Sequence, residues 1–448
     1  MTNYSHFFCY AFLPIGQGLF GAGVMGVNPT GLITPRGHEG FADERIQCSW
    51  VYDCGTSSSD TLLVRAISMV EAGLSKRKRL DLVTISHFDR DHISGVCRLV
   101  KKFRIGTLML PYMPLAQRLV VAFAEDSFPN DELSSFLLNP VAHLLAQDGP
   151  GIEQILFVPP SGGQSPEATD LPPPDPGRFD PDFRGDPGLD FHGGKPDDSD
   201  EWEILANRVQ TSAKQTQVLY LPRGEALRVG SLWEFVPYND DPEHEIPTMF
   251  RFAVRQERHR LLHSISRRSR NNALRKLRRV YDAQFGDSSY DRNRISLYLY
   301  AGPIYDTWRD TWLGDAQRTL GLSVSRTVFR LGPQGTEDCS IIYCGDGYLN
   351  TPESLQRLSG YLGKTRIQRT AAFQVMHHGS EFNWHKGVAA AVAPKISIFS
   401  SDPARKQLGH PHAAVLRDFW PYGPCQVDKE RGITIAGSML IRDGGQML

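Results

Sequence analysis

The sequence contains no apolar run long enough to span a membrane, and it has almost no net charge: 49 Lys and Arg stand against 50 Asp and Glu in 448 residues. The first absence argues against a transmembrane helix. The second excludes attraction of a polyanion by overall charge, so any such attraction must be local. No Cys-x-x-Cys pair occurs among the seven cysteines, which favours reduced thiols and a cytoplasmic protein without a membrane partner. The short apolar run at residues 7–15 lacks a basic start, and we interpret it as a buried strand, not a signal peptide.

One short stretch that follows an apolar run concentrates ligand-type side chains. It holds His87, Asp89, Asp91 and His92. Alternation along an extended chain places His87 and Asp89 on one side, and Asp91 and His92 then open a helix over residues 93–100. A helix cap explains Asp91 alone, whereas two crowded carboxylates are explained by a cation that neutralises them. The stretch therefore predicts a metal pocket.

Two later apolar runs also end in ligand-type residues. Residues 339–344 lead to Asp346, and residues 371–376 lead to His377 and His378. Sheets covered by helices place their chemistry just beyond the strand ends, so we expect these residues in the same pocket. Strand alternation favours His377 as the residue that faces the pocket, with His378 supporting a ligand or contacting substrate. For Asp346, a turn residue between glycines is the alternative.

In this order, these pieces resemble the metallo-β-lactamase fold hydrolases. Their signature is His-x-His-x-Asp-His, and Asp89 stands here in place of the second histidine. The resulting His-x-Asp-x-Asp-His form is similar to the soluble nuclease-type domain of the ComEC competence proteins. Further segments that carry the resemblance are Gly16–Gly18, Val51–Gly55, Asn293–Leu297, Ile341–Asp346, Val375–Ser380, Gly409–His412 and Asp428–Ile435, the last resembling a closing hairpin. The resemblance covers residues 6–115, 215–240 and 293–442.

The resemblance implies an α/β protein with the four-layer αββα metallo-β-lactamase fold. A single domain over residues 1–448 accounts for the chain, with insertions at 116–214 and 241–292. The first insertion follows a helical pattern over residues 115–145 and includes an acidic, Pro/Gly-rich segment at about 159–201 that has too few apolar residues to pack. We interpret this segment as an exposed loop, and docking of a protein partner is the alternative.

The resemblance also implies two divalent metal ions as cofactors. Asp89 adds a hard oxygen ligand and a negative charge, which moves the preference toward manganese or magnesium relative to an all-histidine zinc site. Manganese or zinc are the expected ions, with magnesium as a further option. The implied metal ligands are His87, Asp89, Asp91, His92, Asp346 and His377. One cation takes His87 and Asp89 and the other takes Asp91 and His92, while Asp346 bridges them and His377 completes the second site.

Catalytic roles follow from the same resemblance. The implied catalytic residues are Asp91, His378, His410 and His412. His410 or His412 would donate a proton to the leaving oxygen or hold the phosphate, and a surface turn is their alternative interpretation. The family's ligand histidine between the first motif and the bridging aspartate has no counterpart, because the histidines at 143, 192, 244, 259 and 263 lie outside recognisable strand ends.

The second insertion is strongly basic. Residues 251–280 hold ten arginines and one lysine against the single acid Glu257, with apolar residues at broadly helical spacing. Arginine forks suit phosphate oxygens, and such an excess exceeds what solubility requires. The candidate nucleic-acid-binding residues are Arg255, Arg258, Arg267, Arg268, Arg270, Arg275, Lys276, Arg278 and Arg279. A solvated helix, or a face docked on an acidic protein, is the alternative.

These features favour a metal-dependent hydrolase of phosphodiester bonds, foremost a DNA nuclease. The expected reaction is in-line attack on phosphorus by a hydroxide activated between two metals. One alternative is a hydrolase of a small molecule such as a cyclic nucleotide, thioester or lactam. Another is a catalytically silent subunit that binds nucleic acid or protein. Defence against foreign DNA, such as antiviral defence, is one setting that suits a nuclease of this type.

Overall fold

The structure is a computed structural model. It describes residues 3–28, 46–74, 77–124, 132–162, 189–194, 216–230, 232–240, 246–263, 266–285, 296–304, 309–315, 329–330, 339–405 and 409–442. Most of the Pro/Gly-rich segment predicted at 159–201 lies outside these residues, as do His244 and residues 293–295.

Two mixed β-sheets form the centre of the molecule. The larger has the strand order β12-β11-β17-β1-β2-β3-β4-β5-β6-β7. Its strands are β1 (Asn3–Phe12), β2 (Gly18–Asn28), β3 (Ile46–Thr56), β4 (Arg79–Thr84), β5 (Arg104–Pro111), β6 (Ile152–Val158), β7 (Gln217–Tyr220), β11 (Arg309–Asp315), β12 (Phe329–Arg330) and β17 (Ile433–Arg442). Strands β3 to β7 run parallel to one another, whereas β1 pairs antiparallel with both β2 and β17.

The smaller sheet has the order β16-β15-β14-β13-β10-β9-β8. Its strands are β8 (Leu227–Val229), β9 (Trp233–Asn239), β10 (Leu297–Pro303), β13 (Ser340–Tyr343), β14 (Thr370–Gln374), β15 (Ile396–Ser400) and β16 (Pro424–Val427). Strands β13 to β16 are parallel, so their carboxyl ends meet at one edge.

The two sheets pack face to face over an aromatic core. Trp50 of β3 and Trp233 of β9 have ring centroids 5.8 Å apart and are fully buried. Tyr10 of β1 donates a hydrogen bond of 2.7 Å to the carbonyl oxygen of Cys339, beside β13. Because a buried hydroxyl without a partner is costly, this bond helps to fix how one sheet lies on the other.

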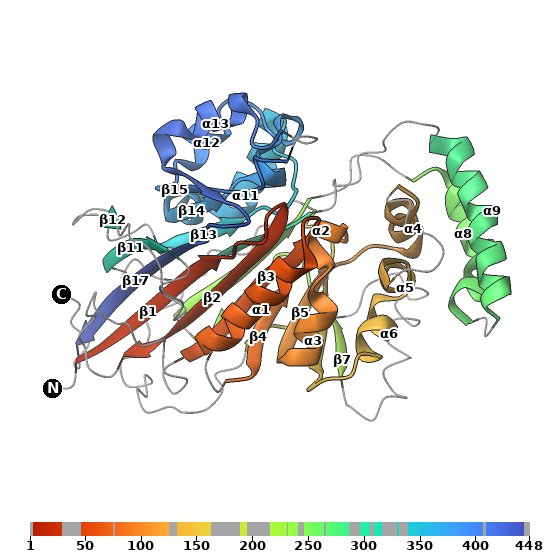
Figure 1. Ribbon diagram of the computed structural model, residues 1–448, viewed down its shortest axis with the longest axis horizontal. Coiled ribbons are helices and arrows are strands. Elements are labelled where there is room, and N and C mark those ends of the chain that lie inside the picture. The colour runs from red at the N-terminus through yellow and green to blue at the C-terminus, as the bar shows by residue number, and fades with distance from the viewer. Residues whose placement is uncertain are drawn as a thin grey trace.

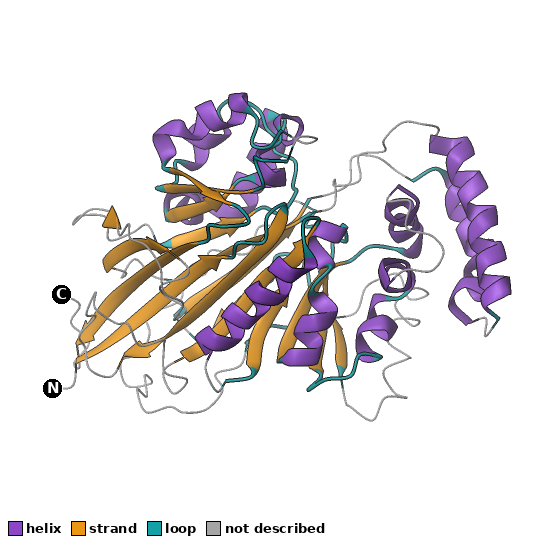
Figure 2. Ribbon diagram, in the orientation of Figure 1, coloured by secondary structure: helices purple, strands orange, loops and turns teal. Residues whose placement is uncertain are grey.

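Helices cover the outer face of each sheet, which gives the order helix, sheet, sheet, helix (Figure 1). The larger sheet is covered by α1 (Asp60–Leu74) and α3 (Val96–Lys102), and the smaller by α11 (Pro352–Gln368), α12 (Val388–Val392) and α13 (Ala413–Phe419). In α1 the buried Leu63, Ala66, Ile67 and Val70 recur every three or four residues, as expected for a helix with one apolar face. The mixed α/β class predicted from the sequence is confirmed (Figure 2).

A separate group of helices lies at one end of the sandwich (Figure 1). It comprises α4 (Leu115–Ala124), α5 (Glu132–Leu138), α6 (Pro140–Leu145), α8 (Thr248–His263) and α9 (Arg267–Phe285). Helices α8 and α9 form a hairpin whose apolar side chains pack on α4 in a cluster of their own. The helical pattern at 115–145 is therefore realised as three helices, and α6 starts where Asn139 accepts a hydrogen bond from the Ala142 amide.

Two local predictions are wrong. The helix expected over residues 93–100 is broken, because the Gly95 amide donates to the Cys54 carbonyl oxygen at 2.7 Å and not to a preceding turn. The tail at Asp428–Ile435 is not a hairpin, since β16 lies in the smaller sheet and β17 in the larger. Its turn carries the chain from one sheet to the other.

No disulfide joins the seven cysteines, all of which lie within the described residues. Among the helices that the structure describes, none combines the length and apolar composition needed to cross a bilayer.

Candidate metal centre

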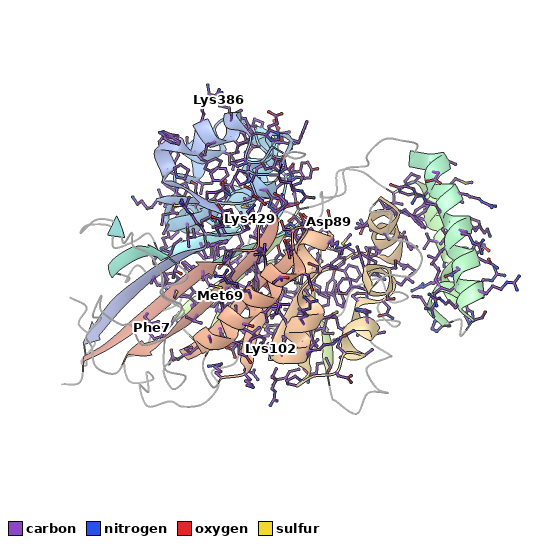
Figure 3. The ribbon with its side chains drawn as sticks, viewed as in Figure 1. Phe7, Met69, Asp89, Lys102, Lys386 and Lys429 are labelled. Atoms are coloured by element: carbon purple, nitrogen blue, oxygen red, sulfur yellow. The ribbon has the colours of Figure 1, made fainter. Side chains whose placement is uncertain are left out.

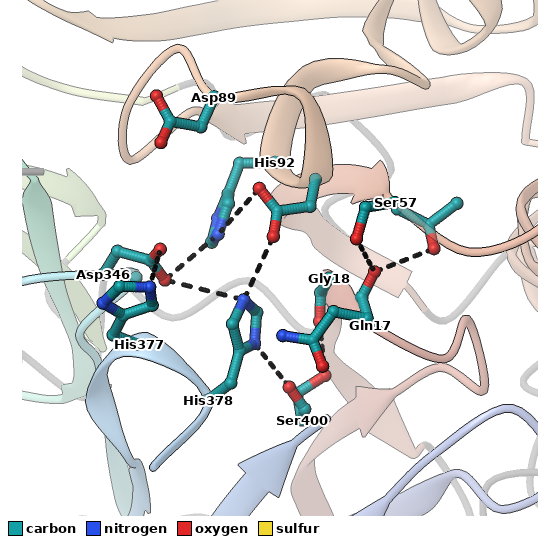
Figure 4. Close-up of polar contacts among 12 residues, drawn as sticks. Gln17, Gly18, Ser57, Asp89, His92, Asp346, His377, His378 and Ser400 are labelled. Atoms are coloured by element: carbon teal, nitrogen blue, oxygen red, sulfur yellow. Dashed lines mark hydrogen bonds and ion pairs between the residues drawn. The ribbon is translucent and has the colours of Figure 1, made fainter. Parts of the chain in front are cut away.

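Several strand ends meet at one edge of the sandwich, and each carries ligand-type side chains. In chain order these are His87 and Asp89 after β4, Asp91 and His92 on the short helix α2 (Arg90–Ile93), Asp346 after β13, and His377 and His378 on the 3-10 turn η4 (Met376–Gly379) after β14. Figure 4 shows His92, His377 and His378 directed toward Asp346. Two sequence motifs that lie more than 250 residues apart, at His87–His92 and from Asp346 onward, thus contribute to one pocket.

Asp346 is the centre of this pocket. Its Oδ1 lies 3.1 Å from His92 Nε2 and 3.8 Å from His378 Nε2, and its Oδ2 lies 3.4 Å from His377 Nε2 and 3.6 Å from His87 Nε2. The residue is only 2% exposed. Burial alone would raise the pKa of the Asp346 carboxyl, but the surrounding imidazoles outweigh burial and hold that pKa well below its usual range. Asp346 is therefore a buried carboxylate.

Two overlapping groups of side chains have ligand atoms within 4.8 Å of one another: His87, His92 and Asp346, and Asp91, His92 and His378. Ligands bound about 2.0–2.2 Å from one ion lie at most about 4.4 Å apart, so small adjustments bring either group to a common cation. Imidazole nitrogens mixed with carboxylate oxygens suit zinc or manganese. Either group could hold a metal ion.

Asp89 and His377 lie beside these groups and belong to neither. The Asp89 carboxylate is 3.7 Å from His87 Nε2. His377 lies near one carboxylate of the two groups, with its Nε2 3.4 Å from Asp346 Oδ2. The strand alternation that favoured His377 over His378 does not hold, because both residues have positive φ angles, 45° and 57°, in a 3-10 turn. The turn directs His378 Nε2 to Asp91 Oδ2 at 3.2 Å.

His87 has an atom that the described residues leave without a hydrogen bond. Its Nδ1 lies 2.8 Å from Ser86 Oγ, but its buried Nε2 has no hydrogen-bond partner in the described part of the chain. Burial lowers the pKa of His87 to about 3, so the ring is neutral and offers a lone pair. A buried acceptor of this kind fits a metal ion, whose histidine ligands usually engage their second nitrogen in this way.

Asp53 supports the pocket from behind. It accepts hydrogen bonds from the amide and hydroxyl of Ser86, at 2.7 and 2.6 Å, and lies 2.7 Å from His92 Nδ1. This contact orients His92 so that Nε2 faces Asp346. Burial raises the pKa of Asp53, partly offset by His92. A Cβ at Gly55 would lie 2.5 Å from the His92 backbone, which explains the glycine of the Asp-Cys-Gly sequence.

The turn that presents Asp346 is fixed by residues that sequence reasoning missed. Gln374 Oε1 accepts hydrogen bonds of 2.7 Å from both the Cys344 and Gly345 amides. Asn383 donates to the Asp346 carbonyl oxygen at 2.8 Å, and its Oδ1 lies 2.6 Å from His377 Nδ1. No local sequence signal marks the side chains of Gln374 and Asn383, because their partners are about 30 residues away or in a different turn.

Strained backbone is concentrated here as well. Among the described residues, the non-glycine positions with positive φ are Asp53, His377, His378 and Ala393. Three of these four lie in or directly behind the pocket. Such conformations cost about 1–3 kcal/mol each and persist where the surroundings enforce them.

His410 and His412 lie next to the pocket on the side of η4. The His410 ring centroid is 5.6 Å from that of His377 and 4.9 Å from that of His412. Burial and the neighbouring imidazoles lower the pKa of His410 to about 3, so it is neutral. His412 Nδ1 accepts a hydrogen bond of 3.1 Å from the Glu381 amide, which leaves the hydrogen on Nε2.

The other described histidines take no part in the two ligand groups. His143 contacts Cys97 at 3.4 Å, His192 is exposed beside Glu225, and His259 packs against His263 on α8. The ligand position noted as vacant in the sequence is filled by none of these four.

The α8–α9 hairpin places its basic side chains in several environments. Arg255, Arg267, Arg268, Arg275, Lys276 and Arg279 are exposed, whereas Arg258, Arg270 and Arg278 are half-buried. Lys276 pairs with the buried Glu257 at 2.6 Å, and Arg278 pairs with Asp282 while lying against the Phe123 ring. Figure 3 shows side chains extending from the outer side of both helices. Arg278 thus anchors the hairpin to α4, and Arg255, Arg267, Arg268, Arg275 and Arg279 lie exposed on its surface.

No family model matches the chain, and no curated protein matches it either. The fold and the site therefore rest on the geometry described above.

Proposed function

We propose that the chain is a metal-dependent hydrolase of phosphodiester bonds, a nuclease, built on a metallo-β-lactamase fold. The helix, sheet, sheet, helix order and the ligand-type residues at the ends of β4, β13 and β14 support this fold assignment. The observation that carries the function is the Asp346 carboxylate, buried among four imidazoles and flanked by two ligand groups that share His92.

The residues present fit divalent cations. His87 supplies a neutral, buried nitrogen, and Asp91 and Asp346 supply carboxylates that stay ionised beside imidazoles. Asp53 and Ser86 hold the two histidines in the required orientation. Divalent cations bound in such a pocket make water a nucleophile at neutral pH and neutralise charge on phosphate oxygens.

Roles for the remaining pocket residues follow from their hydrogen bonds. His378 is held by the Ser400 carbonyl oxygen at 2.5 Å and by Asp91, so it joins the ligands in place of the predicted His377. His412 carries a hydrogen on Nε2 and donates a hydrogen bond from it to a phosphate oxygen, which holds the phosphate in place. Burial lowers the pKa of His410 to about 3, so this ring is neutral and holds no imidazolium proton to transfer.

The basic hairpin supports a nucleic acid as substrate. Its exposed arginines would contact the phosphate backbone at a distance from the chemistry, which positions the strand without reading its sequence. Manganese, zinc and magnesium all remain candidates for the pocket.

The test combines metal analysis with cleavage. Chelated protein is reloaded with manganese, magnesium or zinc and offered single-stranded, double-stranded and circular DNA. We expect cleavage with at least one metal and loss of cleavage in Asp346→Asn. The control Glu71→Gln should keep full activity, because it removes a carboxylate of α1 that pairs with Lys102 of α3. Absence of cleavage with every metal would overturn the proposal.

A further inference from the structure

An exposed aromatic side chain lies next to the candidate metal centre. Phe382 belongs to the 3-10 turn η5 (Glu381–Asn383), which begins three residues after His378, and it is 71% exposed. In the same turn Asn383 is fully buried. Folding alone favours the opposite arrangement, with the phenyl ring inside and the amide outside. The burial of Asn383 is explained by its bonds to His377 and Asp346, whereas the Phe382 ring lies at the surface of the part of the chain that the structure describes.

The turn that carries Phe382 is tied to the pocket on both sides. The Phe382 amide donates to Ser380 Oγ at 3.3 Å, and the Glu381 amide donates to His412 Nδ1 at 3.1 Å. Asn383 donates to the Asp346 carbonyl oxygen at 2.8 Å. The ring is therefore held on a fixed backbone beside the residues that would contact the scissile phosphate.

The ring is also oriented with an open face. Its centroid is 6.3 Å from that of His412, and the two ring planes are at 90°. The rings do not stack on each other, so His412 contacts Phe382 at an edge or on one face only. With most of the residue exposed, a flat face of Phe382 is available to a planar group of a ligand.

We propose that Phe382 is a specificity-determining residue that stacks on a nucleobase next to the scissile phosphate, and that the substrate is unpaired at that base. This inference rests on the proposed nuclease function. Bases stack on aromatic side chains with little regard to sequence. A base inside a duplex already stacks on both neighbours and must leave the helix to reach the ring. Single-stranded or frayed ends therefore meet this platform at lower cost than an intact duplex.

The test measures two enzymes on each of two substrates. Wild type and Phe382→Ala are measured on a single-stranded oligonucleotide and on the same oligonucleotide with an abasic residue beside the cleaved phosphate. We expect Phe382→Ala to raise KM for the normal strand by about 5- to 150-fold, the range of one base–aromatic stack, with kcat nearly unchanged. The abasic strand should show a similar KM with both enzymes, and Phe382→Trp should restore the wild-type value.

The same comparison is then made by equilibrium binding, because binding needs no turnover. The two proteins are Asp346→Asn and the double variant that adds Phe382→Ala, each measured on the normal and the abasic strand. Trp420→Ala is the matched control, since Trp420 is 69% exposed at the opposite end of α13 from His412. Equal losses from Phe382→Ala on normal and abasic strands, or no loss on either, overturn the stacking role. Absence of cleavage by wild type overturns the nuclease proposal instead, while the binding measurements still decide whether Phe382 stacks on a base.

Discussion

The metal pocket and the α8–α9 hairpin both contain many ionisable side chains, but those of the pocket are mostly buried and those of the hairpin are mostly exposed. In the pocket, Asp346 and His92 are almost completely buried, and one carboxylate faces four imidazoles. In the hairpin, most of the arginines are exposed, and they surround a small apolar cluster that is separate from the sandwich core. Buried ionisable groups require a compensating charge inside the protein, whereas exposed cations are stable alone and attract a partner from solution. The pocket could therefore hold a cation, and we propose that the hairpin attracts a polyanion.

The largest expected effect comes from removing the centre of the pocket. Asp346→Asn keeps the shape of the side chain but removes the charge shared by four histidines. We expect cleavage of DNA to fall about 1,000-fold, equal to about 4 kcal/mol of transition-state stabilisation, with the circular dichroism spectrum unchanged. DNA binding through the hairpin should persist. If the variant lost binding and kept cleavage, the proposal that the pocket cleaves DNA and the hairpin binds it would be wrong.

A second variant weakens the pocket without touching the ligand groups. Asp53→Asn removes the carboxylate that orients His92 through Nδ1. Losses of this kind of supporting contact typically cost about 10- to 100-fold in metal affinity or activity. Titration of the chelated protein with manganese, followed by calorimetry, measures the affinity. An unchanged affinity would show that His92 needs no support from Asp53.

Reversing charge on the hairpin probes the other region. Arg268 and Arg279 are exposed on α9, and we expect Arg268→Glu with Arg279→Glu to weaken DNA binding about 10-fold at low salt and to reduce the salt slope by about one per contact removed. Single-turnover cleavage at saturating DNA should be nearly unchanged. The matched control reverses Arg65 and Lys364, two exposed cations of α1 and α11. The same loss in that control would assign the effect to net charge and not to the hairpin.

The smallest effect is on stability in acid. Burial and the adjacent imidazoles lower the pKa of His410 from 6.5 to about 3. Between these values the unfolded chain binds a proton that the folded chain does not, so this group favours unfolding as the pH falls through that window. We expect His410→Gln to reduce the fall in melting temperature of the chelated protein between about pH 7 and about pH 4 by about 2 °C. An equal fall in both proteins would contradict this assignment.

Short-range patterns in the sequence predict the strand ends and many of their side chains. His87, Asp91, His92 and Asp346 were expected in one pocket because each follows a short apolar run, and the structure places them together. The mixed α/β class was implied by the resemblance of the ordered motifs to a known family, and the structure has this class.

What the sequence does not reveal depends on backbone turns and long-range hydrogen bonds. The strand periodicity that favoured His377 over His378 stops at a turn with positive φ, and both imidazoles lie beside Asp346. Gln374 and Asn383 each make several hydrogen bonds to residues of other turns, which no local pattern encodes. The break at Gly95 arises from a bond to Cys54, a residue on β3.

The central claim is that the Asp346 cluster binds divalent cations. The most direct measurement is anomalous X-ray diffraction from manganese-soaked crystals of wild type and Asp346→Asn. The account predicts a peak within bonding distance of Asp346 and His92 in wild type, and its loss in the variant. A wild-type pocket without anomalous density, or an equal peak in both proteins, would contradict it.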